Sequence, residues 1–284
     1  MGGAFARNIL QHGFTVIGYD VVAENVNALA DIGGFSAESP KDVAEQSDVV
    51  ITSLPDTASF HDVMTGVNGI QAASKANLIV LECSTLAIED KQAAHDALKS
   101  VGTILLDCPI SGTGAQAQTR DLSVYVSGDK AASERCQSVL DAMVIHSFYV
   151  GEFSNGSKMK FVANVLVAIH NVATAEAMVL GMKAGLEPDE IFNVIKAGAG
   201  NSRIFELRAP MMVEDNYESA TMKMDVWQKD MTVIGEFARH LECRVPLFDA
   251  SADVYNSGLS QGMDKLDTAS VCRVLEQLSG IQRS

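Results

Sequence analysis

The first half of the chain alternates short apolar runs, rich in β-branched residues, with stretches of helical periodicity. One such stretch is residues 90–100, where we expect Ala93, Ala94, Ala97 and Leu98 to form the apolar side of a helix. Strands that alternate with helices of this length predict βαβ units and a parallel sheet. The predicted strands are residues 14–20, 48–54, 78–82, 103–107, 122–127 and 145–150.

The pattern changes after Gly151. Residues 158–183 lack proline, contain one late glycine and carry apolar residues at helical spacing, which predicts a helix of about 25 residues. Helical stretches follow to the end of the chain. We therefore predict an α/β domain at residues 1–151, followed at residues 152–284 by an all-helical domain.

Charge and the apolar pattern exclude several classes of partner. The formal net charge is −15, and an acidic chain repels phosphate backbones and anionic membranes, so we expect no nucleic acid and no membrane partner. No apolar run approaches the roughly 20 residues that span a bilayer; the most apolar stretch is residues 161–169. The first residues lack the pattern of a secretion signal, so we expect a cytoplasmic protein.

Cysteine and histidine spacing gives no sign of a disulfide framework or a metal centre. The five cysteines are odd in number and widely spaced, without a C-x-x-C pair, which favours reduced thiols. The six histidines are scattered. The sequence therefore predicts no metal site.

The N-terminus suggests the remainder of a dinucleotide-binding turn. Met1-Gly2 leads into a predicted helix at residues 4–11, and the next predicted strand ends at Asp20. In a Rossmann-type domain a first strand runs through G-x-G-x-x-G into such a helix. Only the last glycine is present, as Gly2, so the first strand is missing and we expect the natural start to lie roughly ten residues upstream. The alternative is a glycine-rich start before an ordinary helix.

Asp20 stands where such folds place an acid that binds the adenosine ribose hydroxyls. A carboxylate there repels a 2′-phosphate, and no basic residue follows before Lys41. This favours NAD and makes NADP the less suitable cofactor. A turn residue after a strand is the alternative reading of Asp20.

Residues 107–115 form a loop of small residues after a predicted buried strand. Ligands bind at the carboxyl ends of parallel strands. Ser111 offers a hydroxyl, and Gly112 lets backbone N–H groups approach a carboxylate. A plain turn would have the same composition.

Lys160 and Asn164 are four residues apart on the predicted long helix and share one face. Apolar neighbours, including Phe161 and Leu166, favour a functional role for this pair. The alternative is a solvated helix face. Farther along the chain, Lys229 and Asp230 lie on another predicted helix, where an exposed charge pair is the simplest reading.

Taken in order, these pieces resemble the β-hydroxyacid dehydrogenases, the family of 3-hydroxyisobutyrate dehydrogenase, related more distantly to 6-phosphogluconate dehydrogenase. The resemblance covers essentially the whole chain. The matching pieces are Met1-Gly2 with the glycine turn, Leu54-Pro55 with the cofactor-contacting Leu-Pro, Cys83-Ser84-Thr85 with Ser-Ser-Thr, residues 107–114 with D-x-P-V-S-G-G, residues 156–164 with G-x-G-x-x-K-x-x-N-N, and Lys229-Asp230 with the late Lys-Asp.

The resemblance implies a role for each matching residue. Lys160 would be the catalytic base. Ser111, Gly112, Thr113 and Asn164 would bind a small carboxylate substrate. The cofactor would contact Met1, Gly2, Asp20, Leu54, Pro55, Thr85 and Lys229.

The chain departs from the family pattern at three places. Thr113 replaces the second loop glycine, Ala163 replaces the first of two paired asparagines, and the first strand is missing. The first two are expected to reshape the substrate pocket. The third would weaken the pyrophosphate site and the sheet.

The resemblance implies hydride transfer between a 3-hydroxy acid, or its semialdehyde, and NAD, with Lys160 moving the hydroxyl proton. It also implies a homodimer or homotetramer, in which residues 152–284 form the domain for substrate binding and dimerisation. Two alternatives stay open. One is an NADH-linked semialdehyde or imine reductase. Two features argue against it: NADP-linked reductases of the family carry an Arg where this chain has Val21 and Val22, and imine reductases generally replace the lysine that is present here as Lys160. The other is an inactive truncated paralogue that serves as a binding scaffold.

Overall fold

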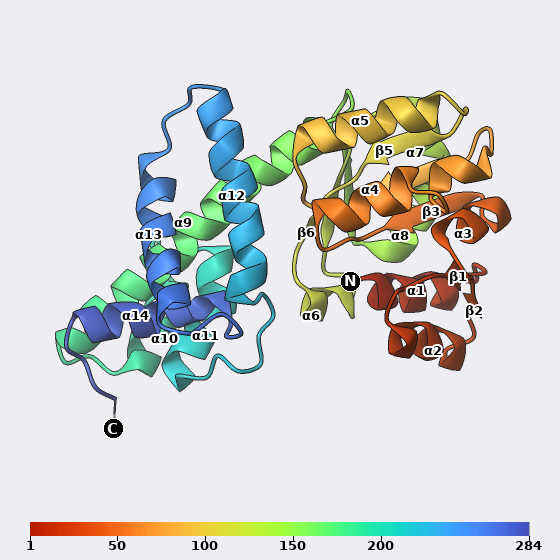
Figure 1. The fold of residues 1–284 in the computed structure, drawn as a ribbon. Helices are drawn as coiled ribbons and strands as arrows, with labels where there is room; N and C mark the ends of the chain where they lie inside the picture. The colour runs from red at the N-terminus through yellow and green to blue at the C-terminus, as the bar shows by residue number, and fades with distance from the viewer. Residues whose placement is uncertain (284) are drawn as a thin grey trace. The chain divides into compact units, whose positions relative to one another are not determined.

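The structure is a computed structural model that describes residues 1–283, and it divides into two compact units, residues 1–160 and 161–284. The first unit is a layered α/β structure (Figure 1). Its elements are α1 (Gly2–Gln11), β1 (Ile17–Gly18), α2 (Ala23–Asp31), β2 (Phe35–Ser36), α3 (Pro40–Gln46), β3 (Val49–Thr52), α4 (Thr57–Thr65), η1 (Ile70–Ala73), β4 (Ile79–Glu82), α5 (Ile88–Lys99), β5 (Ile104–Asp107), β6 (Ile110–Ser111), α6 (Gly114–Ala117), β7 (Ser123–Val126), α7 (Lys130–Arg135), α8 (Gln137–Met143) and β8 (His146–Tyr149).

Parallel pairing dominates this unit, as the alternation of strands and helices predicts. Strands β3, β4 and β5 form one parallel sheet in which Thr52, Glu82 and Asp107 are in register. Strand β7 pairs with β6 antiparallel and with β8 in parallel. The two residues of β1 pair only with β2, in a separate small sheet. Within residues 1–283 no strand joins β1 to β3.

Two apolar clusters cover the two faces of the central sheet. Successive residues of β4 alternate between them, because side chains of a strand point to opposite faces. Leu81 belongs to the cluster that contains Phe5 of α1 and Leu140 of α8. Val80 belongs to the cluster that contains Phe60 of α4 and Leu98 of α5. A sheet covered by helices on both faces is the arrangement expected of buried parallel strands.

The regular elements of the second unit are helices in its described residues, apart from an isolated bridge between Lys223 and Asp267 (Figure 1). Helix α9 begins in the first unit and continues into the second. Helices α12 and α13 pack together, as do α13 and α14 and the pair α10 and α11. The elements are α9 (Asn155–Lys183), α10 (Pro188–Lys196), α11 (Arg203–Glu214), α12 (Met224–His240), α13 (Pro246–Ser260), η2 (Thr268–Ser270) and α14 (Val271–Leu278).

Buried polar side chains join helices within the second unit. The amide of Asn171 on α9 donates to the Tyr255 hydroxyl and to the Thr268 carbonyl, both at 2.9 Å. The Tyr255 hydroxyl in turn donates to the Ala168 carbonyl at 3.3 Å. Helix α9 is therefore held by directed bonds as well as by apolar packing.

Helix α9 also bears on one expectation from the sequence. It is long and apolar enough to cross a membrane by length and composition, with a mean hydropathy of 1.6 in a window that is 39% buried. The sequence has no uninterrupted apolar run of this length, but the few polar residues of α9 leave its mean hydropathy high. The core helix of a soluble protein passes the same test, so the finding is weak evidence for a membrane span.

Candidate functional site

The carboxyl ends of β3, β4 and β5 bring three predicted site segments to one edge of the sheet. Leu54-Pro55 follows β3, Thr85 follows β4, and the small-residue loop follows β5. The backbone N–H of Leu54 donates to the Ser84 hydroxyl at 2.8 Å, and the Ser84 N–H donates to the Glu82 carboxylate. The Leu-Pro and Ser-Thr segments are therefore tied together, at the edge where parallel sheets bind ligands.

Asp20 follows β1 and is exposed. Its carboxylate accepts hydrogen bonds from the Val22 N–H and from the Asn25 side-chain amide, both at 2.9 Å. These bonds fix the orientation of the carboxylate. Val21, next to it, is 87% exposed, so the surface beside Asp20 is apolar where a basic side chain would be needed to neutralise a phosphate.

Met1 and Gly2 are exposed at the N-terminus of α1, and no side chain caps this helix end. The first N–H groups of a helix have no partner within it and attract anions. On the opposite end of α1, the Asn8 amide donates to the Ala117 carbonyl at 2.9 Å. Helix α1 is thereby joined to α6, at the end of the loop of small residues.

The loop of small residues at 107–115 contains strand β6 and the beginning of α6. Ser111 lies in β6, paired with β7. Gly112 has a φ of +133°, and a Cβ there would lie 2.4 Å from a methyl carbon of Leu122, so only glycine fits. Thr113, the departure from the family pattern, is the N-cap of α6: its hydroxyl accepts from the Gln116 N–H, and its own N–H donates to the Gln116 side chain at 3.0 Å.

The beginning of α9 is bonded to the end of β5. The Ser157 N–H donates to Asp107 Oδ2 at 2.7 Å, and its hydroxyl donates to Oδ1 at 2.8 Å. A Cβ on Gly156 would lie 2.5 Å from the Tyr125 carbonyl oxygen and 2.7 Å from that of Asp107. Glycine is therefore required for this close approach, and Lys160, which is 8% exposed, follows in the next turn of α9.

Sequence reasoning missed a buried lysine in this part of the first unit. Lys91 on α5 is fully buried, and its Nζ lies 2.7 Å from the Ser84 carbonyl, 2.8 Å from Asp107 Oδ1 and 3.7 Å from Glu82 Oε2. A signal was present, because Lys91 lies on the helical stripe of Ala94 and Leu98. The expectation that Ala93 belongs to that stripe is wrong, since Ala93 is exposed.

The charges around Lys91 keep it an ammonium. Burial works to lower its pKa, but the attraction of Asp107 and then Glu82, with the hydrogen bond to Asp107, more than offsets burial and raises the pKa. Burial is also the main reason why the pKa values of the Cys83 and Cys108 thiols are raised. These two thiols therefore stay protonated and do not act as nucleophiles at neutral pH.

The second unit brings together the other predicted site residues. Asn164 is 2% exposed, and its amide donates to Asp230 Oδ2 at 3.0 Å. The other carboxylate oxygen of Asp230 lies 3.4 Å from Lys229 Nζ. The Lys-Asp pair is thus more than an exposed charge pair: Asp230, which the sequence reading did not assign to the site, orients Asn164.

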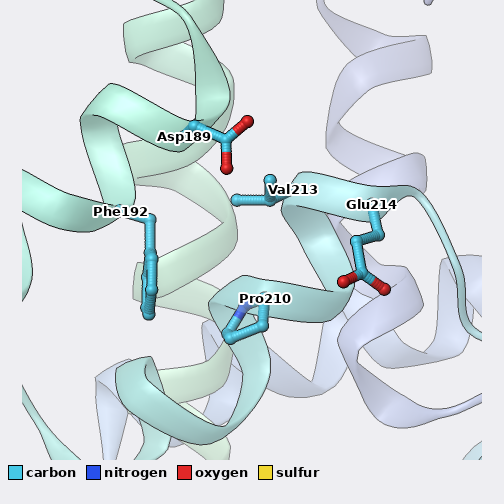
Figure 2. A pocket seen from close by; sticks show the side chains of 5 residues that line it. All are labelled: Asp189, Phe192, Pro210, Val213 and Glu214. Atoms are coloured by element: carbon cyan, nitrogen blue, oxygen red, sulfur yellow. The ribbon is translucent and has the colours of Figure 1, made fainter.

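A hollow of about 360 Å³ in the second unit is separate from these groups. Figure 2 shows that Asp189, Phe192, Pro210, Val213 and Glu214 line it. None of these is a predicted site residue. Two carboxylates and no cationic side chain make this lining unsuitable for a carboxylate substrate.

Family models match both parts of the chain. The NAD-binding domain of 6-phosphogluconate dehydrogenase matches residues 1–151. The model described as the NAD-binding domain of NADP-dependent 3-hydroxyisobutyrate dehydrogenase matches residues 154–275.

Individual relatives are similar over nearly the full chain. An L-threonate dehydrogenase of Cupriavidus necator is 30% identical over 275 residues, 96% of this chain and 92% of the relative. A 2-(hydroxymethyl)glutarate dehydrogenase of Eubacterium barkeri is 28% identical and covers 100% of this chain and 94% of its own length. A crystal structure of 3-hydroxyisobutyrate dehydrogenase from Salmonella typhimurium superposes with a TM-score of 0.87 at 28% identity, covering 96% of this chain and 95% of that one.

Proposed function

The chain belongs to the β-hydroxyacid dehydrogenase family and is an NAD-linked hydroxyacid dehydrogenase, and we propose that Lys160 is its general base and a small 3-hydroxy acid its substrate. In the reverse direction the substrate is the corresponding semialdehyde. The relatives named above act on hydroxy acids that differ in size and charge, so the proposal extends to the class and not to one member.

The residues of the first unit fit NAD. The uncapped N-terminus of α1, with Met1 and Gly2, suits the pyrophosphate, because helix N–H groups bind anions. The carboxylate of Asp20, held by two hydrogen bonds, suits the ribose hydroxyls and repels a 2′-phosphate. We assign the nicotinamide to the segments of Leu54-Pro55 and Thr85, with Lys229 as a further cofactor contact.

The carboxylate of the substrate is assigned to Ser111, Gly112 and Thr113. The Thr113 N–H already donates to Gln116, so the Ser111 hydroxyl and the backbone at Gly112 carry most of this binding. Asn164 holds the substrate hydroxyl or carboxylate from the second unit, in the orientation that Asp230 sets.

Lys160 moves the proton. In oxidation, its neutral Nζ accepts the hydroxyl proton while the C–O bond becomes a carbonyl; in reduction, the ammonium returns the proton to the carbonyl oxygen. NAD, when bound, supplies the hydride acceptor.

One observation carries the assignment of Lys160: the hydrogen bonds of Ser157 to Asp107. They attach the first turn of α9 to the end of β5, from which the substrate loop departs. Lys160 lies one turn farther along the same helix.

The experiment measures NAD reduction with a panel of short 2- and 3-hydroxy acids, including L-threonate and 3-hydroxyisobutyrate. Lys160→Ala should lower kcat by about 100- to 10,000-fold, the usual contribution of general acid–base catalysis. Lys158→Ala is the matched control, because Lys158 is exposed on the same turn of helix and should leave kcat unchanged. Near-normal turnover in Lys160→Ala would refute the assignment.

A second readout separates the dehydrogenase from the scaffold. A ligand that binds only the folded chain raises its Tm, so NAD should raise Tm more than NADP does. If no acid is turned over and NAD leaves Tm unchanged, the scaffold interpretation replaces the one proposed here.

We further propose that the protein is cytoplasmic and forms a homodimer or homotetramer. Large apolar side chains remain exposed on the helical unit, among them Leu180 at 73% and Leu278 at 74%, and apolar patches of this kind favour association. Light scattering coupled to size exclusion gives the subunit number directly, and a monomer at micromolar concentration would overturn this part.

A further inference from the structure

Lys91 is the centre of a buried network that no role in the proposed mechanism requires. Its ammonium donates to the Ser84 carbonyl and to Asp107, and it faces Glu82. These partners follow or end two neighbouring strands, β4 and β5. A single side chain on α5 therefore joins the ends of two strands from which predicted site segments depart.

The network continues from Asp107 to the beginning of α9. Besides Lys91, the Asp107 carboxylate accepts the N–H and the hydroxyl of Ser157. The Ser127 hydroxyl lies 3.4 Å from the same carboxylate and accepts the Gly156 N–H at 2.9 Å. The rotation of the Asp107 carboxylate thus determines where the first turn of α9 lies.

The network also continues from Ser84 to the segment after β3. The Ser84 hydroxyl accepts the N–H of Leu54, and the Ser84 N–H donates to Glu82. Through Ser84, Lys91 is connected to the Leu-Pro and Ser-Thr segments. Through Asp107, it is connected to the substrate loop and to the helix of Lys160.

We propose that Lys91 is a positioning residue, which aligns the two cofactor segments with the substrate loop and with Lys160. The inference rests on the proposed function of those segments. Burying an ammonium is costly, and an apolar replacement of a buried ion pair often leaves stability unchanged. What an apolar side chain cannot supply is the pair of directed bonds that joins the Ser84 carbonyl to the Asp107 carboxylate.

Removal of the ammonium should act on turnover through geometry. Glu82 and Asp107 would then face each other in a buried site without a cation, and repulsion would turn one of them. Rotation of Asp107 would shift the Ser157 end of α9. A displacement of about 1 Å in a catalytic group costs up to about 100-fold in rate.

The experiment compares Lys91→Met with the double variant Lys91→Met/Glu82→Gln in the full chain. The native cluster has two carboxylates and one ammonium, and the double variant keeps the same formal charge with one carboxylate. If Lys91 only neutralises charge, the double variant recovers both Tm and kcat. If Lys91 positions the segments, the double variant recovers most of the Tm but leaves kcat about 10- to 100-fold low, with a smaller change in the KM for the acid.

Leu98→Ala is the matched control for general destabilisation. Leu98 is fully buried on the same helix, α5, but packs in the apolar cluster outside the network. It should lower Tm while kcat, measured well below the melting temperature, stays within about threefold. An equal loss of kcat in Leu98→Ala would overturn the inference, as would recovery of kcat in the double variant.

Hydrogen exchange of the backbone amides of residues 155–160 gives a readout that needs no substrate. The double variant should exchange faster there than the wild type, while Leu98→Ala should not. If the wild type turns over no acid, the proposed function fails, and the exchange data alone decide for or against Lys91. If Lys91→Met does not fold, the charge-matched double variant and the control still give the comparison.

Discussion

Each unit buries a cationic side chain, but the two cations connect different parts of the molecule. In the first unit, Lys91 joins the segments that we assign to cofactor, substrate and base. In the second unit, Arg208 on α11 lies 2.7 Å from Asp267 Oδ1 and 2.8 Å from Oδ2. Asp267, fully buried, also accepts the N–H groups of Thr221, Met222 and Ala269.

The two networks obey the same rule and differ in what they hold. A buried charge is tolerated where directed bonds satisfy it, and both clusters meet this condition. The Arg208 network attaches α11 to the loop before α12 and to η2, and it includes none of the predicted site residues. Burial and charge therefore do not by themselves show whether a residue has a functional role. A positioning residue differs from a structural one in the segments that its network connects.

The largest expected effect comes from removing the structural cation. Arg208→Met should lower the free energy of unfolding by about 3–5 kcal/mol, because it leaves Asp267 buried without its cation. Below the melting temperature kcat should stay within about twofold of the wild type. Urea unfolding and steady-state kinetics on the same preparation measure both quantities.

Arg239→Met is the control for this variant. Arg239 is exposed on α12 and its contact with Glu236 is 4.0 Å, so its removal should change the free energy of unfolding by less than about 0.5 kcal/mol. A fall in kcat of Arg208→Met as large as that of Lys91→Met would erase the distinction between the two networks.

A smaller effect should appear at alkaline pH. Because the pKa of Lys91 is raised in the folded chain, its contribution to stability is complete below the unfolded lysine pKa of about 10.4 and is lost as pH rises through the folded value. The wild type should therefore lose more free energy of unfolding above about pH 10.4 than Lys91→Met/Glu82→Gln does.

The second unit supplies the comparison for this pH dependence, since guanidinium groups stay protonated in proteins. The free energy of unfolding of Arg208→Met should fall with pH in parallel with that of the wild type over the alkaline range, at a lower value throughout. Parallel curves for the wild type and the double variant of Lys91 would contradict the raised pKa.

Local periodicity predicts the central strands well and the edge strand poorly. Residues 78–82 are predicted as a strand and β4 covers Ile79–Glu82, with neighbours on both sides. Residues 14–20 are also predicted as a strand, but only Ile17 and Gly18 form β1. A strand needs a partner for its N–H and C=O groups, and β1 pairs on one edge only within the described residues.

The site is predictable where a motif is local and not where partners are distant in sequence. Asp107, Lys160 and Asn164 stand in short patterns that the sequence displays. Lys91 meets Glu82 and Asp107, nine and sixteen positions away on two strands, and only the folded sheet brings them together. Helix α9 likewise begins at Asn155, before the predicted residue 158, because the Ser127 hydroxyl and the Asp107 carboxylate accept two of its first N–H groups.

The smallest effect tests how much the neutral buried hydrogen bonds of the helical unit contribute to stability, compared with the ion pair of Arg208. Tyr255→Phe removes the hydroxyl that donates to Ala168 and accepts from Asn171. It should lower the free energy of unfolding by about 1–3 kcal/mol, because it removes two neutral hydrogen bonds and each contributes about 0.5–1.5 kcal/mol net; this is below the loss expected for a buried charge. Asn171 keeps its bond to the Thr268 carbonyl, so α9 should remain in place and kcat should not change. A loss equal to that of Arg208→Met would show that the neutral bonds of this unit contribute as much to stability as its ion pair does.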